Sequence, residues 1–174
     1  MLGQSIFVLA PLVVVLSGRW SWDFIGLSRR GLASSLALGA LLALIVVIPT
    51  EVAPYLLGYD TPVFQITDPS RYLGVPLAVL LYLPFWGIFE SVWLCYLIYA
   101  INRWLTGGSD LSWRALLLAA LWFGLLHAFT QLLAFGAPLP QVLDSMVIGL
   151  ALLIPGTIPK FTGNAWGLIT VTNF

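Results

Sequence analysis

Long apolar stretches that hold almost no charge constrain the fold of this chain more than any other feature of its sequence. Five such stretches and a short sixth are present, at residues 2–17, 32–49, 72–101, 115–135, 139–158 and 165–174. A helix needs about 20 residues to cross the roughly 30 Å hydrocarbon core of a bilayer. The middle stretches meet that length, the first is marginal, and the last covers only about 15 Å. Prolines near both ends of the fifth stretch are expected to bound its helix: Pro138, Pro140, Pro155 and Pro159.

The composition argues against a water-soluble fold. Of the 174 residues, 60% are hydrophobic and 8% are charged, whereas a soluble domain usually carries about 25% charged residues. Too little polar surface remains to cover so much apolar side chain. Helices are favoured over barrel strands, because the stretches lack the alternation of barrel strands and backbone amides in lipid need internal partners. We therefore expect an all-α membrane fold: a single transmembrane domain over residues 1–174, forming a polytopic helix bundle of about six segments.

The basic residues are distributed unevenly among the connecting loops. If the loops between the six stretches are numbered in chain order, the first, third and fifth hold six basic residues: Arg19, Arg29, Arg30, Arg103, Arg114 and Lys160. The even-numbered loops hold Arg71, together with Glu51, Asp60 and Asp68. Because positively charged loops stay on the cytoplasmic side, this pattern predicts a multi-pass integral membrane protein with cytoplasmic Arg-rich loops and an outside N-terminus. A net charge of zero gives no electrostatic basis for binding nucleic acid.

Two ionisable residues, Glu90 and His127, fall deep inside apolar stretches. Such residues usually face the interior of a bundle or a wet cavity, because a charge in lipid is costly. Each lies about 17 Å along its helix from the expected cytoplasmic end, at 1.5 Å per residue. Thr172 and Asn173 of the last stretch reach about the same depth. Adjacent helices are therefore expected to bring a carboxylate, an imidazole and an amide together in the middle of the membrane.

These groups are parts of a hydrolytic site. Glu90 could act as general base toward a water, while His127 could orient that water or donate to an oxyanion, and Asn173 could donate as well. Two other interpretations remain open. In one, Glu90 and His127 pair only to join two helices; in the other, His127 is the axial ligand of a pigment or haem. A catalytic zinc takes three protein ligands and the chain has one histidine, so no metal or other cofactor is predicted.

Several short motifs resemble one protein family. Residues 123–127 have the form FxxxH, residues 162–166 form a Thr-Gly-small-x-Trp turn before a final apolar segment, and residues 22–30 contain an early Gly-Leu loop. In this order and spacing they are similar to the CAAX-protease and bacteriocin-processing family of intramembrane endopeptidases, also called abortive-infection proteins. The resemblance covers nearly the whole chain and implies a peptidase fold of membrane helices.

The first catalytic motif of that family is altered. The family has a pair of glutamates followed by an aromatic residue and an arginine. Here Glu90 is the second glutamate of the pair, and Phe89 stands in place of the first, which the family uses to activate water. Trp93 takes the aromatic position and Leu94 that of the arginine.

The last helix departs from the family as well. The family's histidine six residues after the tryptophan is Thr172 here, and its asparagine would fall beyond Phe174. The resemblance therefore implies a catalytically degenerate endopeptidase that retains Glu90 and His127. One reading is an enzyme, open to the cytoplasm, that cleaves a substrate peptide. The other interpretation is a non-catalytic structural or binding subunit of a larger membrane protein complex. Its expected partners are the lipid bilayer and other membrane protein subunits, and its aromatic-rich surface would contact lipid or pigment.

Overall fold

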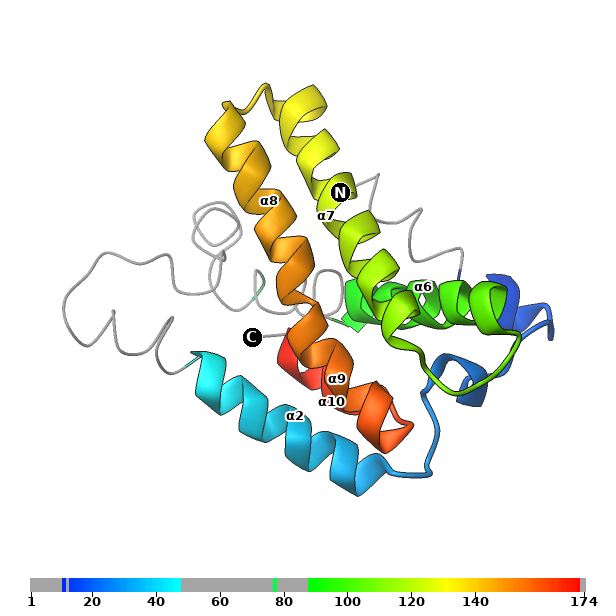
Figure 1. Ribbon diagram of the computed structural model, residues 1–174. Helices are drawn as coiled ribbons and strands as arrows, with labels where there is room; N and C mark the ends of the chain where they lie inside the picture. The colour runs from blue at the N-terminus through cyan, green and yellow to red at the C-terminus, as the bar shows by residue number, and fades with distance from the viewer. Residues whose placement is uncertain (1–10, 12, 48–76, 78–87, 173–174) are drawn as a thin grey trace.

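The computed structural model describes residues 11, 13–47, 77 and 88–172, and this part of the chain is helical without strands (Figure 1). The all-α class is therefore confirmed for these ranges. Most of the first apolar stretch and half of the third lie outside these ranges. The elements, in chain order, are the short 3-10 helix η1 (Asp23–Ile25) and the α-helices α2 (Leu32–Val47), α6 (Phe89–Thr106), α7 (Trp113–Phe135), α8 (Leu139–Ala151), α9 (Leu153–Thr162) and α10 (Trp166–Thr172).

The helices α7 and α8 form an antiparallel hairpin whose ends follow from the local sequence (Figure 1). Ser112 caps the start of α7, because its side-chain oxygen accepts the backbone N–H of Ala115 at 3.2 Å. Gly136 ends α7 in the left-handed conformation, with φ at 60°. Pro138 precedes α8 in extended conformation, and Pro140 lies in the first turn. The expected start of the fifth stretch is confirmed.

Small residues line the contact between α7 and α8. Ala120, Gly124 and Ala128 recur every fourth residue on α7 and are buried, which places them on one face. Ser145 and Gly149 do the same on α8. A Cβ atom added to Gly149 would lie 2.7 Å from the carbonyl oxygen of Ala120 and closer still to the Gly124 backbone. The two backbones therefore touch, as in close-packed membrane helices.

The helices α2 and α10 meet in the same way. Ser35, Gly39 and Ala43 form the buried stripe of α2, and a Cβ on Gly39 would lie 2.7 Å from the Cα of Gly167 on α10. The Ser35 hydroxyl donates to the carbonyl of Asn164 at 2.7 Å and accepts the N–H of Gly167 at 2.8 Å. This polar contact ties the start of α10 to α2.

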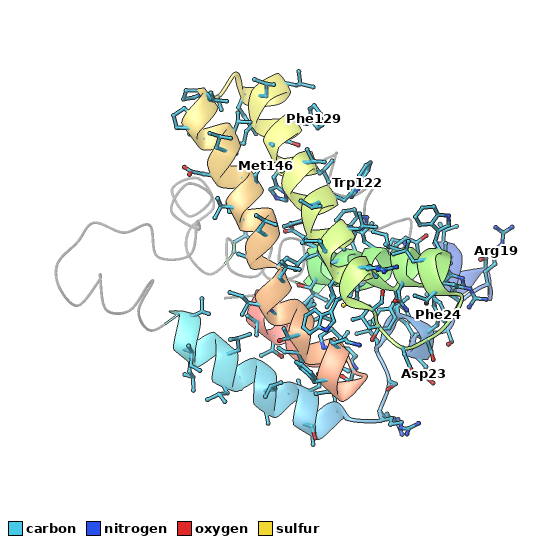
Figure 2. All side chains as sticks on the ribbon, in the orientation of Figure 1. Arg19, Asp23, Phe24, Trp122, Phe129 and Met146 are labelled. Carbon is cyan, nitrogen blue, oxygen red and sulfur yellow. The ribbon has the colours of Figure 1, made fainter. Side chains whose placement is uncertain are left out.

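The outward faces of the hairpin carry large apolar side chains. Trp122 and Phe129 of α7 are 54% and 57% exposed, and Val147 of α8 is 63% exposed. Figure 2 shows Trp122 and Phe129 directed away from the helix pair. Small residues inside and large apolar residues outside reverse the arrangement of a soluble core.

Two helical segments of the described chain are long and apolar enough to cross a membrane, judged by length and composition. They are Trp113–Leu133 and Leu139–Thr162, which joins α8 to α9. Only 33% and 39% of their most apolar windows are buried, whereas a core helix of a soluble protein is mostly buried. The shorter Leu32–Val46 segment of α2 is also apolar.

A break at Leu152 separates α8 from α9, and its cause lies in the next turn. Pro155 has no N–H to donate to the carbonyl of Ala151, and a proline commonly kinks a helix just before itself. The chain then continues helically past Pro159, which lies inside α9, to Gly163. The expectation that Pro155 and Pro159 bound the helix is therefore wrong.

One apolar cluster joins α6, which runs crosswise to α7 in Figure 1, to its neighbours. Its fully buried members include Ile25 of η1, Ile98 of α6, Leu116 of α7 and Leu168 of α10. This cluster fixes the position of α6 beside α7, and with it the position of Glu90.

Candidate functional site

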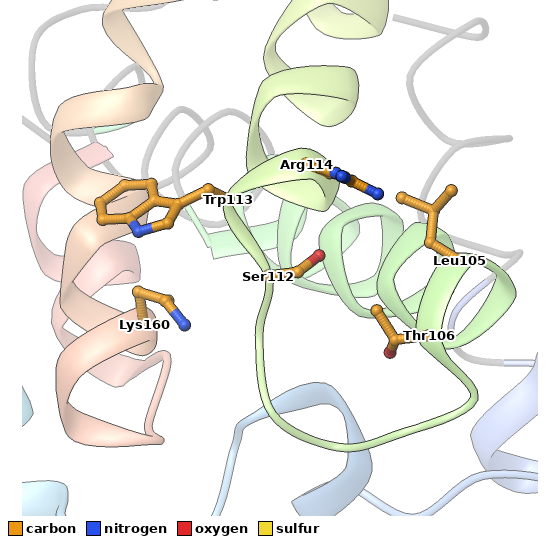
Figure 3. Close-up of a pocket in the computed structure, with 6 residues that line it drawn as sticks. All are labelled: Leu105, Thr106, Ser112, Trp113, Arg114 and Lys160. Carbon is orange, nitrogen blue, oxygen red and sulfur yellow. The ribbon is translucent and has the colours of Figure 1, made fainter.

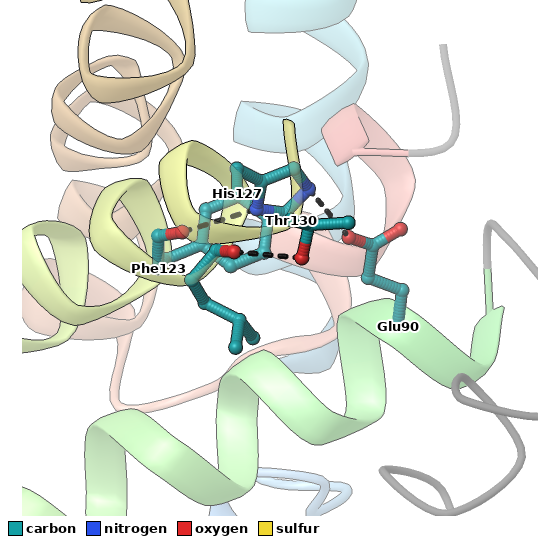
Figure 4. Close-up of polar contacts among 5 residues, drawn as sticks. Glu90, Phe123, His127 and Thr130 are labelled. Carbon is teal, nitrogen blue, oxygen red and sulfur yellow. Dashed lines mark hydrogen bonds and ion pairs between the residues drawn. The ribbon is translucent and has the colours of Figure 1, made fainter. Parts of the chain in front are cut away.

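Glu90 and His127 approach each other across the α6–α7 contact (Figure 4). Glu90 lies in the first turn of α6 and His127 in the second half of α7. Their Oε1 and Nε2 atoms are 3.8 Å apart, and the two side chains are 29% and 33% exposed, respectively. The expected meeting of these two residues is therefore present in the structure.

The FxxxH spacing fixes the orientation of the histidine ring. Nδ1 of His127 lies 3.0 Å from the carbonyl oxygen of Phe123, one helical turn earlier. A carbonyl oxygen only accepts, so Nδ1 must carry a proton. In the neutral imidazole Nε2 then presents its lone pair to Glu90. The Phe123 ring packs against the imidazole with centroids 4.2 Å apart, which holds the ring in this position.

This geometry determines what the pair can hold. An ionised carboxylate and the Nε2 lone pair are both acceptors, so the contact needs a proton on one of them or a donor between them. A separation of 3.8 Å exceeds a direct hydrogen bond and suits a bridging water placed to one side. The pair can therefore form an ion pair when His127 is protonated, or bind one water molecule that bridges the two side chains.

Leu94, at the position where the resembling family has arginine, lies in an apolar environment. It is 2% exposed and belongs to a cluster with Trp93, Ala120, Phe123 and Leu152. The rings of Trp93 and Phe123 lie 6.3 Å apart in the same cluster. The cluster fills the neighbourhood of the FxxxH motif with hydrocarbon rather than with a cation.

The remaining candidate site residues, Thr172 and Asn173, are at the end of the described part of the chain or beyond it. Asn173 is not among the described residues, and neither is the side chain of Thr172. Their role beside Glu90 and His127 therefore stays a prediction. Among the described residues, no three His, Cys, Asp or Glu side chains gather as metal ligands would.

Asn102 is a buried polar residue that the sequence analysis did not identify. It is 1% exposed near the end of α6. Its Nδ2 donates to the carbonyls of Gly108 and Asp110 at 3.2 and 3.1 Å, and its Oδ1 accepts the N–H of Ser112 at 2.8 Å. It therefore closes the loop between α6 and α7 and sets the start of α7. An asparagine one turn before a Gly-Gly sequence is the signal that could have indicated this role.

Asn164 has the same role between distant segments. It is 0% exposed, and its Nδ2 donates to the carbonyls of Ser28 and Arg30 at 2.7 and 2.9 Å. Its Oδ1 accepts the N–H of Trp166 at 3.0 Å, which caps α10. The early loop and the 162–166 turn, two of the motifs of the resemblance, are thus joined by one side chain.

In comparisons with protein-family models, curated proteins and solved structures, none matches this chain.

Proposed function

We propose that this chain is a multi-pass integral membrane protein related to the CAAX-protease and bacteriocin-processing family, in which the Glu90–His127 pair joins helices in place of catalysing cleavage. The burial of Leu94 in an apolar cluster beside the FxxxH motif carries this proposal. In the family an arginine at that position would lie beside the catalytic glutamate. Without that cation Glu90 has His127 as its one ionisable neighbour within ion-pair distance among the described residues.

Two features support the membrane placement. The outward faces of α7 and α8 expose large apolar side chains such as Trp122 and Val147, while small residues pack inside, as lipid-embedded helices require. A hydrogen bond joins Asn164, just after α9, to Arg30, just before α2. Another joins Asn102, near the end of α6, to the loop that follows α6. Most of the described basic residues belong to these ends, which supports a single cytoplasmic side and an outside N-terminus.

A structural pair in this position has a definite physical role. Glu90 on α6 and His127 on α7 each bring a polar group to a face that is otherwise apolar, and each partially satisfies the other. Interhelical polar contacts in membranes contribute about 1 kcal/mol. We propose that the chain acts as a non-catalytic structural or binding subunit of a larger membrane complex, in contact with lipid or pigment through its outward aromatic side chains.

One observation favours endopeptidase activity as a second candidate. The carboxylate of Glu90 and Nε2 of His127 converge at 3.8 Å and remain about one-third exposed. A water held there could give a proton to Glu90 while its oxygen attacks a peptide carbonyl carbon. A protonated His127 could donate to the oxyanion that forms, and Glu90 could then pass its proton to the leaving amine as the peptide bond breaks.

A double-mutant cycle separates the two candidates. We expect Glu90→Gln and His127→Gln each to lower the free energy of unfolding by about 1 kcal/mol, and their combination to cost less than the sum. Unfolding in bicelles, followed by tryptophan fluorescence, measures all three. Thr130→Val is the matched control, because among the described residues the Thr130 hydroxyl bonds only to the carbonyl of Leu126 in its own helix.

The opposite outcome supports the enzyme. Residues of an active site commonly lower stability for the sake of activity, so their removal stabilises the protein. Single variants more stable than the wild type, with no coupling between them, would therefore contradict a structural pair. Cleavage of a membrane-embedded test peptide by the wild type, lost in Glu90→Gln, would establish the second candidate directly.

A further inference from the structure

A pocket outside the Glu90–His127 pair lies where three helices end (Figure 3). Its volume is about 480 Å³, and it is lined by Leu105, Thr106, Ser112, Trp113, Arg114 and Lys160. The residues come from the end of α6, the start of α7 and the last turn of α9. Figure 3 shows Trp113 and Lys160 on one side and Arg114 on the other, with Ser112 between them.

The charges of the pocket are of one sign. Arg114 and Lys160 are its only ionisable lining residues, and neither makes an ion pair with any carboxylate in the described part of the chain. Asp110, in the neighbouring loop, forms no ion pair with Arg114 or Lys160. Two cations from different helices that share one pocket without a counter-ion favour an anionic ligand.

The polar donors of the pocket suit a phosphate group. The Ser112 hydroxyl accepts the N–H of Ala115, so its own proton remains for another acceptor. The backbone N–H groups of Trp113 and Arg114 have no acceptor within α7, because they belong to its first turn. An arginine binds phosphate oxygens in a planar fork and a lysine binds them as a point charge.

The apolar parts of the pocket indicate where that phosphate comes from. Trp113 packs edge-on against Phe161 with ring centroids 6.1 Å apart. Phe161 is 72% exposed, and Trp104, next to Leu105, is 80% exposed. Aromatic side chains gather at the headgroup level of a bilayer, and basic pockets between helix ends on the cytoplasmic side bind anionic headgroups.

We infer that the Arg114–Lys160 pocket binds a phosphate group, supplied by the headgroup of an anionic phospholipid or by free phosphate. The lipid source rests on the membrane placement of the proposed function, whereas the phosphate site itself does not. Neither source involves Glu90 or His127. Flotation of the same protein with liposomes tests the membrane placement separately, so the two failures can be told apart.

Binding is tested on the full chain in nanodiscs with two ligands. In one arm, phosphatidylglycerol is increased in a phosphatidylcholine bilayer, and the lipids retained by the protein are counted by native mass spectrometry. In the other arm, inorganic phosphate is titrated in a phosphatidylcholine bilayer and the unfolding temperature is followed. A parallel titration with potassium chloride at equal ionic strength gives the change in unfolding temperature that is due to charge screening alone.

The variant is Arg114→Gln with Lys160→Gln, and its control is Arg19→Gln with Arg29→Gln. The control removes the same charge from exposed residues that do not line the pocket. We expect the test variant to weaken binding about 25-fold, or about fivefold per cation, and the control less than about twofold. Loss in the lipid arm alone assigns a headgroup, and loss in the phosphate arm alone assigns free phosphate. Equal loss in both variants, or no saturable binding in either arm, overturns the inference.

Discussion

Two buried asparagines set the loops at one end of this molecule. Asn102 binds the loop between α6 and α7, and Asn164 binds the early loop to the start of α10. Each uses both its amide hydrogens and its carbonyl oxygen, so a shorter or apolar side chain leaves backbone groups unsatisfied in a buried place. These residues position the helices that carry Glu90 and the Arg114–Lys160 pocket.

We expect Asn164→Ala to lower the free energy of unfolding by about 2–3 kcal/mol, because the carbonyls of Ser28 and Arg30 lose their donor. Chemical unfolding in bicelles measures the change. Thr170→Val is the control, since within the described part of the chain the Thr170 hydroxyl bonds only to a carbonyl of α10. Equal effects of the two substitutions would remove Asn164 from its role as the link between these segments.

The approach of Glu90 and His127 could be predicted from the sequence, and the reason is geometric. Helical rise predicted a similar depth for the two residues on parallel helices, whereas in the structure α6 runs crosswise to α7 and the contact forms at the first turn of α6. The orientation of the imidazole ring was not predicted, although the FxxxH spacing places the Phe123 carbonyl one turn before His127. The links made by Asn164 could not be predicted, since they join residues more than a hundred positions apart.

The close contact of α7 with α8 is the main packing feature at the level of the elements. Gly124 and Gly149 let the two backbones touch. This close approach allows extensive van der Waals packing between the helices. The four-residue spacing of small residues, starting from Ala120, was visible in the sequence. It was not used in the prediction, because length and hydropathy define spans without indicating which face of a helix is buried.

We expect Gly149→Ala to destabilise the hairpin by about 1–3 kcal/mol, because the added Cβ meets the backbone of Gly124 and forces the helices apart. Val147→Leu is the matched control on the outward face, where 63% of the side chain is exposed. Unfolding in bicelles compares the two. Tolerance of Gly149→Ala at wild-type stability would show that the helices are not in backbone contact.

Proline was a partly reliable guide to helix boundaries. Pro138 and Pro140 lie at the start of α8, where a proline costs no hydrogen bond. Pro155 and Pro159 lie within a segment that remains helical around them. Inside a bundle, neighbouring helices and local adjustments compensate for the missing N–H. A single sequence does not reveal those neighbours, so the kink at Leu152 could not be distinguished from an end.

For the molecule as a whole, the sequence predicted the class more securely than the number of spans. All described elements are helical, and two segments have the length and composition of membrane spans. The expected count of about six depends also on stretches outside the described residues. The membrane placement depends on the outward faces of α7 and α8, whose exposed apolar side chains would be unfavourable in water.

Trp122 gives the most direct test of this placement. It lies about 14 Å along α7 from Trp113, near the middle of a 30 Å core, and it is 54% exposed on the outward face. The difference in fluorescence between the wild type and Trp122→Phe, reconstituted in liposomes, isolates its emission. We expect lipids brominated deep in their acyl chains to quench that emission and aqueous iodide to leave it unchanged. Quenching by iodide and not by brominated lipid would place α7 in water and contradict a membrane protein.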